Sequence, residues 1–429
     1  MEINKKIADG NRLVKNVSWI FFGNVVHAIL VFLLNIFVAR SLTLNDNGLL
    51  TYSTSWINFF TAVGTLGFNG IISREFSKNE NKFNEYIWSC IFCRILFGII
   101  AIILVQILVK ISSPNEPLLH LIVLCQSSMI LFSSFDLFIY WYRYKNQAKV
   151  TAVYRLIAFF ISAFFRVVAI GVIKSVVLYV IGVALETLLF VSFLYKFYRK
   201  HYTKRIIIKK DIAFKMLGMS YPFIFSAILS MIYGQADKIM LKSMIDNTSV
   251  ALYNAATTIA GLVVIIPTTL IEGFRSDIMD AKIHNEKLYQ KRLSQLYSIV
   301  FWCCVAYGIV ISLFSKPIIY ILYGEKYFGA AKALSLIVWY TSFSYFGAIN
   351  NVFMVAEEKQ KWVQITTLVG AIANVILNFI FIPMWGIVGA ALASFLTQIL
   401  ANFVMMFIFR DLQKGFKIML RGILFKGIF

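Results

Sequence analysis

Charged residues are scarce in this chain. Asp, Glu, Lys and Arg together make up 14% of its 429 residues, whereas a soluble domain averages roughly a quarter. Hydrophobic residues make up 60%. A composition this poor in charge is typical of a chain that lies in a lipid bilayer. The sequence therefore indicates an integral membrane protein and argues against a soluble enzyme.

Nucleotide-binding and catalytic motifs are lacking as well: there is no P-loop, Rossmann fingerprint, HExxH or nucleophile elbow. The five cysteines all lie within apolar runs. Cys90 and Cys93 form a lone CxxC pair, which is a poor zinc or redox site without a second pair. We therefore expect no catalysis, no metal and no other cofactor. Because no segment is long and polar enough to hold an ATP site, the expected energy source is an ion gradient or the membrane potential.

Acidic residues are half as frequent as basic ones, 20 against 41, which gives a net charge of +21. The basic residues fall in short clusters between apolar runs and form no continuous patch, so no nucleic-acid partner is expected. Most of them lie at the N-terminus, in every second loop and in the C-terminal tail. This bias is typical of cytoplasmic loops and predicts that both termini are cytoplasmic.

Apolar stretches of roughly 20 residues, the length that crosses a bilayer as a helix, recur twelve times along the chain. The sequence therefore predicts an all-α integral membrane protein with twelve transmembrane helices. The predicted spans are 16–39, 48–72, 86–109, 118–142, 150–173, 175–196, 214–241, 248–272, 293–315, 331–356, 362–382 and 386–409.

Two halves of six spans each are expected, because the longest cytoplasmic segment lies in the middle of the chain. Similar short motifs occur at equivalent places in the halves, such as Gly182-Val-Ala-Leu185 and Gly389-Ala-Ala-Leu392. Six spans is an even number, so the halves would be parallel repeats with the substrate path between them. The predicted parts are an N-terminal six-helix bundle at 1–197, a basic cytoplasmic linker at 198–213, a C-terminal six-helix bundle at 214–409 and a basic cytoplasmic tail at 410–429.

The stretch from Asn374 to Ser394 predicts a tight hairpin of two spans. Pro383 ends the first helix because proline cannot continue the hydrogen-bond ladder, and the second helix restarts near Gly386. Small residues from Gly389 to Ser394 allow close helix packing. Asn374 and Asn378, one turn apart, are candidates to line the transport path.

Three arginines lie within predicted spans: Arg94, Arg155 and Arg166. A charge at mid-membrane costs about 3 kcal/mol on insertion scales, which favours a position facing a cavity or a partner. Arginine binds phosphate in a bidentate manner, so these residues predict a cationic cavity for an anionic lipid head group. Two alternatives stay open: Arg166 pairs with Glu186, or Arg155 extends to the cytoplasmic interface.

Further ionisable candidates lie in spans one, six and seven. Asp237 and Lys238 are predicted to line the same cavity, or else to satisfy each other as an interfacial pair. Glu186, a deep acid, and His27 are candidates for ion coupling, and a hydrogen-bonded core histidine is the alternative for His27.

Arg74 and Arg275 end even-numbered spans at the cytoplasmic side, at equivalent places in the two halves. They are predicted to gather a phosphate at the cavity mouth. The alternative is that they anchor the helices to lipid head groups.

Four motifs along the chain resemble those of Wzx-type O-antigen and polysaccharide flippases, which belong to the multidrug/oligosaccharidyl-lipid/polysaccharide exporter superfamily. The four stand in the family's order along nearly the whole chain. They are Leu42-x3-Asp46-x-Gly48, Asp237-Lys-Ile-Met-Leu241, Pro317-Ile-Ile-Tyr-Ile-Leu-Tyr-Gly324 and Asn374-x3-Asn378-x4-Pro383-x2-Gly386-x2-Gly389-Ala-Ala.

The resemblance implies a MATE-like pair of six-helix bundles arranged in a V, in a bacterial inner membrane. It implies alternating-access transport, coupled to an ion gradient, of an undecaprenyl-pyrophosphate-linked oligosaccharide such as an O-antigen or capsule repeat unit. The role would be in polysaccharide biosynthesis, including that of lipopolysaccharide. A polysaccharide polymerase and chain-length proteins are the protein partners that it suggests.

Two departures refine the resemblance. Lipid II flippases carry two further C-terminal spans, and their lack here counts against lipid II as substrate. Drug exporters rely on buried carboxylates, whereas the charges within these spans are mostly arginine, so an anionic substrate is expected. The alternatives are a proton- or sodium-coupled multidrug exporter of the same superfamily, and a non-transporting partner of a glycosyltransferase complex.

Overall fold

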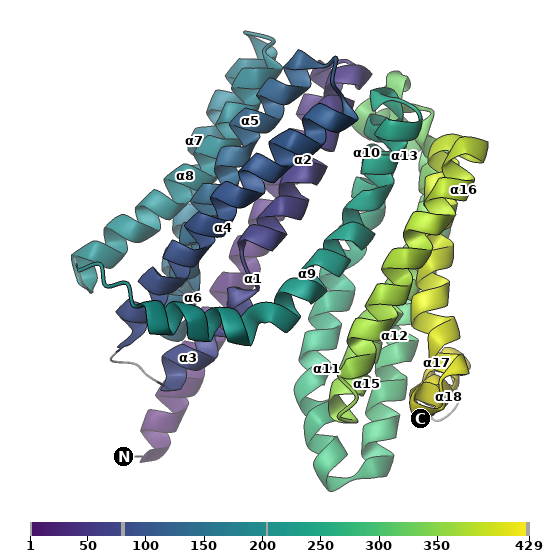
Figure 1. Cartoon of the computed structure of the whole chain (residues 1–429). Helices are drawn as coiled ribbons and strands as arrows, with labels where there is room; N and C mark the ends of the chain where they lie inside the picture. The colour runs from purple at the N-terminus through teal and green to yellow at the C-terminus, as the bar shows by residue number, and fades with distance from the viewer. Residues whose placement is uncertain (1, 79–81, 203–204, 426–429) are drawn as a thin grey trace. The chain divides into compact units, whose positions relative to one another are not determined.

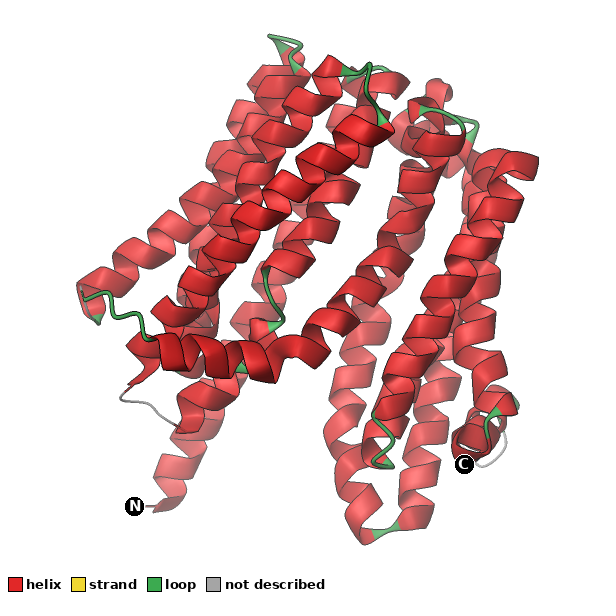
Figure 2. Cartoon of the chain, in the orientation of Figure 1, coloured by secondary structure: helices red, strands yellow, loops and turns green. Residues whose placement is uncertain are grey.

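The structure, a computed structural model, describes residues 2–78, 82–202 and 205–425, without the side chains of residues 2–17 and 77. Every regular element in these ranges is a helix (Figure 2), as predicted. Residues 203–204 of the predicted linker and 426–429 of the predicted tail lie outside the described residues. The chain divides into two compact units, Met1–Met231 and Ile232–Phe429. This division lies within one helix, and the linker at 198–213 stays a prediction.

The described residues of the first unit form the nine α-helices α1 to α9, and α9 continues into the second unit. Within it, α7 packs against α8 and α1, and α5 packs against α8, α2 and α4 (Figure 1). The helices are α1 (Glu2–Ser41), α2 (Leu44–Gly64), α3 (Ile72–Lys78), α4 (Phe83–Ser112), α5 (Pro117–Phe132), α6 (Phe138–Tyr144), α7 (Ala148–Gly171), α8 (Val176–His201) and α9 (Lys210–Met244), with short 3-10 turns η1 (Phe68–Gly70) and η3 (Ser133–Leu137).

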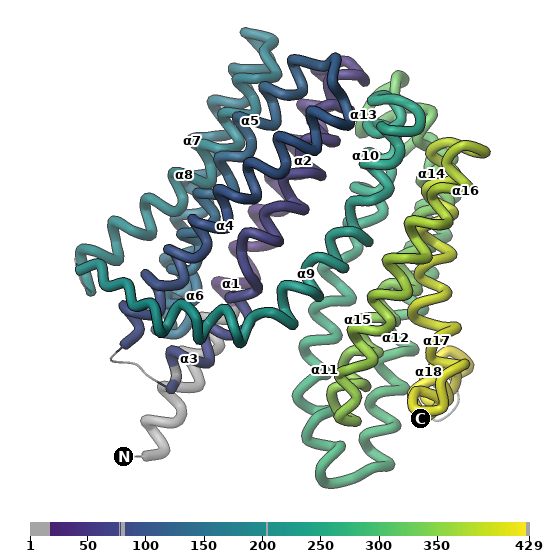
Figure 3. Tube along the Cα trace, viewed as in Figure 1, coloured from purple at the N-terminus to yellow at the C-terminus, as the bar shows by residue number. Residues whose placement is uncertain are grey.

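The second unit begins within α9, and its described residues also contain the nine α-helices α10 to α18. In it, α12 lies beside α11, α15 and α18 (Figure 3), and α14 packs against α10 and α16. The elements are α10 (Asn247–Ala260), η4 (Gly261–Val264), α11 (Ile265–His284), α12 (Glu286–Leu313), α13 (Ser315–Tyr323), η5 (Glu325–Tyr327), α14 (Ala330–Ile337), α15 (Tyr340–Ala356), α16 (Lys361–Ile399), the π-helix η6 (Leu400–Val404), α17 (Met405–Ile408), η7 (Arg410–Leu412) and α18 (Gln413–Ile423).

Within the described residues, nine helical segments are long and apolar enough to cross a membrane. The chain is therefore a multi-pass membrane protein. One of the nine, Lys361–Ile408, contains both arms of the predicted hairpin. Helix α2 and the α14–α15 region are not among the segments that are long and apolar enough. The number twelve stays a prediction.

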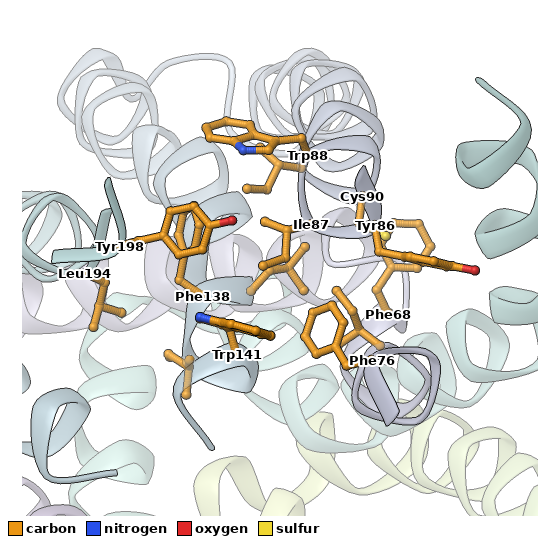
Figure 4. Packing of buried hydrophobic residues seen from close by; sticks show 14 of the residues in the cluster. Phe68, Phe76, Tyr86, Ile87, Trp88, Cys90, Phe138, Trp141, Leu194 and Tyr198 are labelled. Atoms are coloured by element: carbon orange, nitrogen blue, oxygen red, sulfur yellow. The ribbon is translucent and has the colours of Figure 1, made fainter. Parts of the chain in front are cut away.

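Aromatic side chains form the core at one end of the first unit (Figure 4). The Phe83 ring stacks on Trp141 at 3.7 Å between centroids, and Phe76 meets Trp141 edge-on at 5.9 Å. Tyr198 packs at 4.7 Å from Phe138. Aromatic side chains bury large areas at low conformational cost, so this cluster fixes the short helices α3 and α6 against α4 and α8.

The predicted hairpin lies within α16. Gly386 has φ of +58°, a left-handed conformation that glycine adopts without strain, and the chain reverses there. A Cβ on Gly389 would lie 2.0 Å from the Phe381 carbonyl oxygen, so only glycine fits where the two arms meet. Asn374 on one arm contacts Ser394 on the other. The predicted hairpin and the restart of the chain near Gly386 are confirmed, but the prediction that Pro383 ends the first helix is wrong, since the helix continues past Pro383 and breaks at Gly386.

Two lysines and two glutamates form a charge network that connects α18 to α11, to α12 and to the end of α15. The Glu357 carboxylate, 12% exposed, accepts hydrogen bonds from Lys414 at 2.6 Å and from Lys282 at 2.7 Å. Both lysines also contact Glu286, at 2.9 and 3.1 Å. Burial by itself would raise the pKa of Glu357, but the hydrogen bonds from the two lysines hold that pKa below its usual 4.5.

We expect Glu357→Gln to lower the free energy of unfolding by about 1–3 kcal/mol, because two partly buried lysines lose a charged acceptor. The native pKa of Glu357 is lowered, so its contribution is present above pH 4.5 and is lost as the pH falls through the native value. The Tm difference between wild type and variant, measured in detergent, should therefore shrink below about pH 4.5. The adjacent exposed Glu358 provides the control Glu358→Gln, and equal effects of both substitutions would contradict the prediction.

Candidate functional site

Arg94 on α4 is fully buried, at 0% exposure. Its guanidinium group donates four hydrogen bonds to other protein atoms. Nε donates to the Thr65 carbonyl at 3.0 Å and Nη2 donates to Asn69 Oδ1 at 2.5 Å. Nη1 donates to the Ser133 carbonyl at 3.4 Å and to Asp136 Oδ1 at 2.7 Å. The two carbonyls belong to the C-caps of α2 and α5. Arg94 thus supplies donors at two helix ends, where carbonyls lack intrahelical partners.

Arg166 on α7 pairs with Glu186 on α8, which is the structural alternative considered from the sequence. Arg166 Nη2 donates to Glu186 Oε2 at 2.6 Å and to Ser162 Oγ at 2.9 Å. His27 Nε2, on α1, lies 2.9 Å from Glu186 Oε1. The two residues predicted for ion coupling and one predicted for anion binding therefore form one network. A Cβ on Gly182 would lie 2.6 Å from Arg166 Cγ, so the glycine makes room for this arginine.

Arg155 has a different environment, because it lines an open cavity of about 300 Å³ between α1, α6 and α7. In the described part of the chain, Arg155 donates a 3.3 Å hydrogen bond to Asn24 Oδ1, and its guanidinium carbon lies 5.1 Å from the centre of the Phe190 ring. Arg143 shares the cavity and lies 5.6 Å from the Tyr140 ring. We call this cavity the arginine pocket; its lining residues are Ile20, Gly23, Asn24, Ile139, Arg143, Thr151, Ala152 and Arg155.

The charge balance of the first unit follows from these contacts. Arg94 is neutralised by Asp136 and Arg166 by Glu186. Among the described residues, Arg155 has no carboxylate within 4.0 Å. Of the three arginines in the predicted spans, Arg155 is thus the one without a carboxylate partner in the described part of the chain.

The second unit contains a buried polar cluster around Asp237 of α9. Asn378 and Asn374 Nδ2 atoms donate to Asp237 Oδ1 at 2.6 and 3.1 Å. Ser394 Oγ donates to Oδ2 at 2.5 Å, and the Tyr253 hydroxyl donates to the same oxygen. All five side chains are less than 9% exposed. We call this group the Asp237 cluster; its members are Asp237, Tyr253, Asn374, Asn378 and Ser394.

The Asp237 cluster can hold a proton or a small cation. A carboxylate, amide oxygens and hydroxyls are the oxygen ligands that hard cations prefer, and Asn378 Oδ1 is buried without a hydrogen-bond partner in the described residues. Rotation of the Asn378 amide would turn that oxygen toward Asp237. The described residues contain no group of three or more His, Cys, Asp and Glu side chains that would form a conventional metal site.

The sequence identified parts of this cluster without joining them. Asp237 was predicted to lie in a cavity or to pair with Lys238, but the hydrogen-bond donors to its carboxylate are amides and hydroxyls. Ser394 was predicted to serve packing only, and Tyr253 was not identified. The spacing Asn374-x3-Asn378, which places two amides on one helix face, was the available signal.

The remaining predicted residues lie at other places. Arg74 is exposed on α3. Arg275 on α11 pairs with Glu272 one turn away, at 2.9 Å and with both side chains largely exposed. Lys238 is half-buried on α9. The binding roles of these three residues stay predictions.

We expect Arg94→Gln to lower the free energy of unfolding by about 1–3 kcal/mol, because two helix-end carbonyls lose their donor and Asp136, 30% exposed, loses its counter-charge. The expected readouts are a lower Tm and less inserted protein. Replacing both partners, as in Arg94→Leu with Asp136→Leu, should restore part of the loss. Arg155→Gln is the matched control, since it removes one long hydrogen bond. A wild-type Tm for Arg94→Gln would exclude the structural role.

Comparison with known proteins gives the context of these sites. Residues 13–272 match the family described as polysaccharide biosynthesis protein, and residues 222–380 match the MatE family. An uncharacterized membrane protein of Methanocaldococcus jannaschii is 22% identical over 421 residues, which are 89% of this chain and 81% of that protein. The probable flippase AglR of Haloferax volcanii is 27% identical over 177 residues, which are 40% of this chain and only 37% of AglR.

The solved structure of the lipid II flippase MurJ in an inward closed conformation is similar, with a TM-score of 0.76 at 17% sequence identity. The match covers 94% of this chain and 90% of that chain. This likeness confirms the predicted fold class. Because the match to residues 13–272 includes more than half of the chain, the protein belongs to the polysaccharide biosynthesis protein family of the multidrug/oligosaccharidyl-lipid/polysaccharide exporter superfamily, a family of transporters and not of enzymes.

Proposed function

We propose that the protein is a flippase that moves an undecaprenyl-pyrophosphate-linked oligosaccharide, such as an O-antigen or capsule repeat unit, across the bacterial inner membrane by alternating access. Support comes from the family membership and from two similar proteins whose names describe them as flippases, AglR and MurJ. In this proposal both termini are cytoplasmic, and a polysaccharide polymerase and chain-length proteins are the protein partners.

The observation that carries the proposal is the charge balance of the first unit. Arg94 and Arg166 have carboxylate partners, whereas Arg155 has none among the described residues. A guanidinium group held in a membrane without a counter-charge is costly, and a pyrophosphate would supply that charge with bidentate geometry. A cationic drug would be repelled from the same place.

Energy coupling is proposed to occur at the Asp237 cluster. The Asp237 carboxylate is 8% exposed and its hydrogen-bond donors are neutral, so a coupling ion bound there would supply the positive charge that these partners lack. Glu186 and His27, the coupling residues predicted from the sequence, are bonded to each other and to Arg166. Asp237 therefore replaces them as the first candidate.

The second candidate function is a proton- or sodium-coupled multidrug exporter. The match of residues 222–380 to the MatE family favours it, as does the buried carboxylate of Asp237 within that range. The two functions differ in the charge of the substrate, so they are separated by comparing an anionic lipid-linked oligosaccharide with a cationic dye.

In vesicles reconstituted with the chain, we expect a fluorescent undecaprenyl-pyrophosphate-linked oligosaccharide to become accessible to an impermeant quencher faster than in protein-free vesicles. Arg155→Gln should slow this movement about tenfold or more, since a charge-assisted contact to phosphate is lost. The exposed Arg199, on the same unit, provides the control Arg199→Gln. Export of a cationic dye without movement of the oligosaccharide would establish the second candidate function. Movement of neither substrate would contradict both and favour a non-transporting partner of a glycosyltransferase complex.

The same vesicles test the coupling site. We expect a proton or sodium gradient to accelerate wild-type transport and to have no effect on Asp237→Asn, because the neutral amide holds neither ion. The change conserves size, and the 77% exposed Asp280 provides the control Asp280→Asn, which should respond like the wild type. An unchanged gradient response in Asp237→Asn would place coupling elsewhere.

A further inference from the structure

We propose that the arginine pocket binds the phosphate group of a lipid, with Arg143 and Arg155 as its two phosphate ligands. The inference deepens the proposed function. It rests on that function in one respect only, namely that the transported lipid is one of the lipids whose phosphate could bind in the pocket. Arg143 lies between the predicted fourth and fifth spans, in a basic loop predicted to be cytoplasmic, and the sequence did not single it out. The pocket therefore lies at the predicted cytoplasmic end of the first unit.

The pocket is formed where α1 crosses α7. A Cβ on Gly23 would lie 2.7 Å from the Ala152 Cβ, so these two small residues let the helices approach closely. The side chains around this crossing leave an open hollow, whose empty volume of about 300 Å³ includes space open to solvent. Asn24 and Thr151 provide further polar groups in its wall.

The two guanidinium groups keep most of their donors for a ligand. An arginine has five N–H donors, and Arg155 uses one of them within the described residues, in a long hydrogen bond of 3.3 Å to Asn24. Arg143 is exposed and lies over the Tyr140 ring. In contrast, Arg94 makes four hydrogen bonds to protein atoms. The pocket therefore differs from the paired arginines in having donors to offer.

The positive charge around the pocket also favours the binding of an anion. Arg143 and Arg155 are close enough to repel each other electrostatically. Lys149, next to the pocket along the chain, lies 5.4 Å from the Trp19 ring of α1 and adds a further positive charge. The two acids that act on Arg155, Asp136 and Glu186, are each paired with another arginine. A phosphate between the two arginines would relieve their repulsion and accept a bidentate contact from each.

The side of α1 next to the pocket fits the apolar part of a lipid. Phe21, Asn24 and Ala28 are exposed, and their spacing places them on one helix face. The apolar window of α1 is 11% buried, compared with 22–44% for the other candidate spans. A lipid whose phosphate enters the pocket could therefore lay its chain along α1. This feature distinguishes a lipid phosphate from free inorganic phosphate.

The test measures binding by the purified full-length chain in nanodiscs of phosphatidylcholine. The probe is farnesyl diphosphate, and farnesol and inorganic diphosphate are its two halves. We expect farnesyl diphosphate to bind more tightly than either half. Arg143→Gln and Arg155→Gln should each weaken it about tenfold or more, and Arg199→Gln should bind like the wild type. Equal affinities of wild type, Arg143→Gln and Arg155→Gln would overturn the proposal, as would an equal loss in Arg199→Gln.

A second variant distinguishes loss of binding from loss of folding. Asn24→Phe fills the pocket from an exposed position and keeps both arginines, so it should abolish binding at a wild-type Tm. Binding that persists in Asn24→Phe would overturn the proposal. The binding of farnesyl diphosphate is also measured in nanodiscs that contain phosphatidylglycerol. Weaker binding there would show that the site also accepts bulk phospholipid, and unchanged binding would show selectivity for an isoprenyl diphosphate. Both results support a lipid-phosphate site.

The outcome is separable from that of the proposed function. If Arg155→Gln loses binding of farnesyl diphosphate but still moves the lipid-linked oligosaccharide at the wild-type rate, the pocket is a lipid site without a part in transport. If the wild type binds the probe but moves no oligosaccharide, the proposed function fails and the site remains. Binding and translocation that fall together in Arg143→Gln and Arg155→Gln support both.

Discussion

An ionised or polar side chain inside a membrane must find a partner, since hydrocarbon offers neither hydrogen bonds nor counter-ions. This constraint explains the contacts of Arg94 and Arg166 in the first unit. Arg94 reaches Asp136 and two backbone carbonyls, and Arg166 reaches Glu186, which also binds His27. These contacts connect α1, α2, α4, α5, α7 and α8. Charges that looked functional in the sequence therefore also hold the unit together.

The same constraint makes the exceptions informative. In the first unit the exception is Arg155, which faces a cavity and has no carboxylate partner among the described residues. In the second unit it is Asp237, whose partners are neutral amides and hydroxyls. In the proposed function, the first unit binds the anion and the second unit binds the proton or cation. A transporter that couples an anionic substrate to an ion gradient needs both.

Breaks in the helices occur where polar side chains are present to support them. Arg94 contacts carbonyls at the ends of α2 and α5, and Asn350 donates to the carbonyl of Asn402 within the π-helix of the last span. The break at Gly386 brings Asn374 opposite Ser394. Irregular backbone is tolerated at membrane depth where it is buried in protein, and here it also gathers the groups of the candidate sites.

The sequence by itself determined the membrane class, the helical fold, and a hairpin near Pro383 and Gly386, which the structure breaks at Gly386. Composition, run length and proline chemistry are local properties, so one sequence suffices to read them. Only the tertiary structure decided which charges are paired. Asp136 is 42 residues from Arg94, and Asn374 is 137 residues from Asp237. Periodicity gives the face of a side chain on its own helix, but the partner depends on which helix packs against that face.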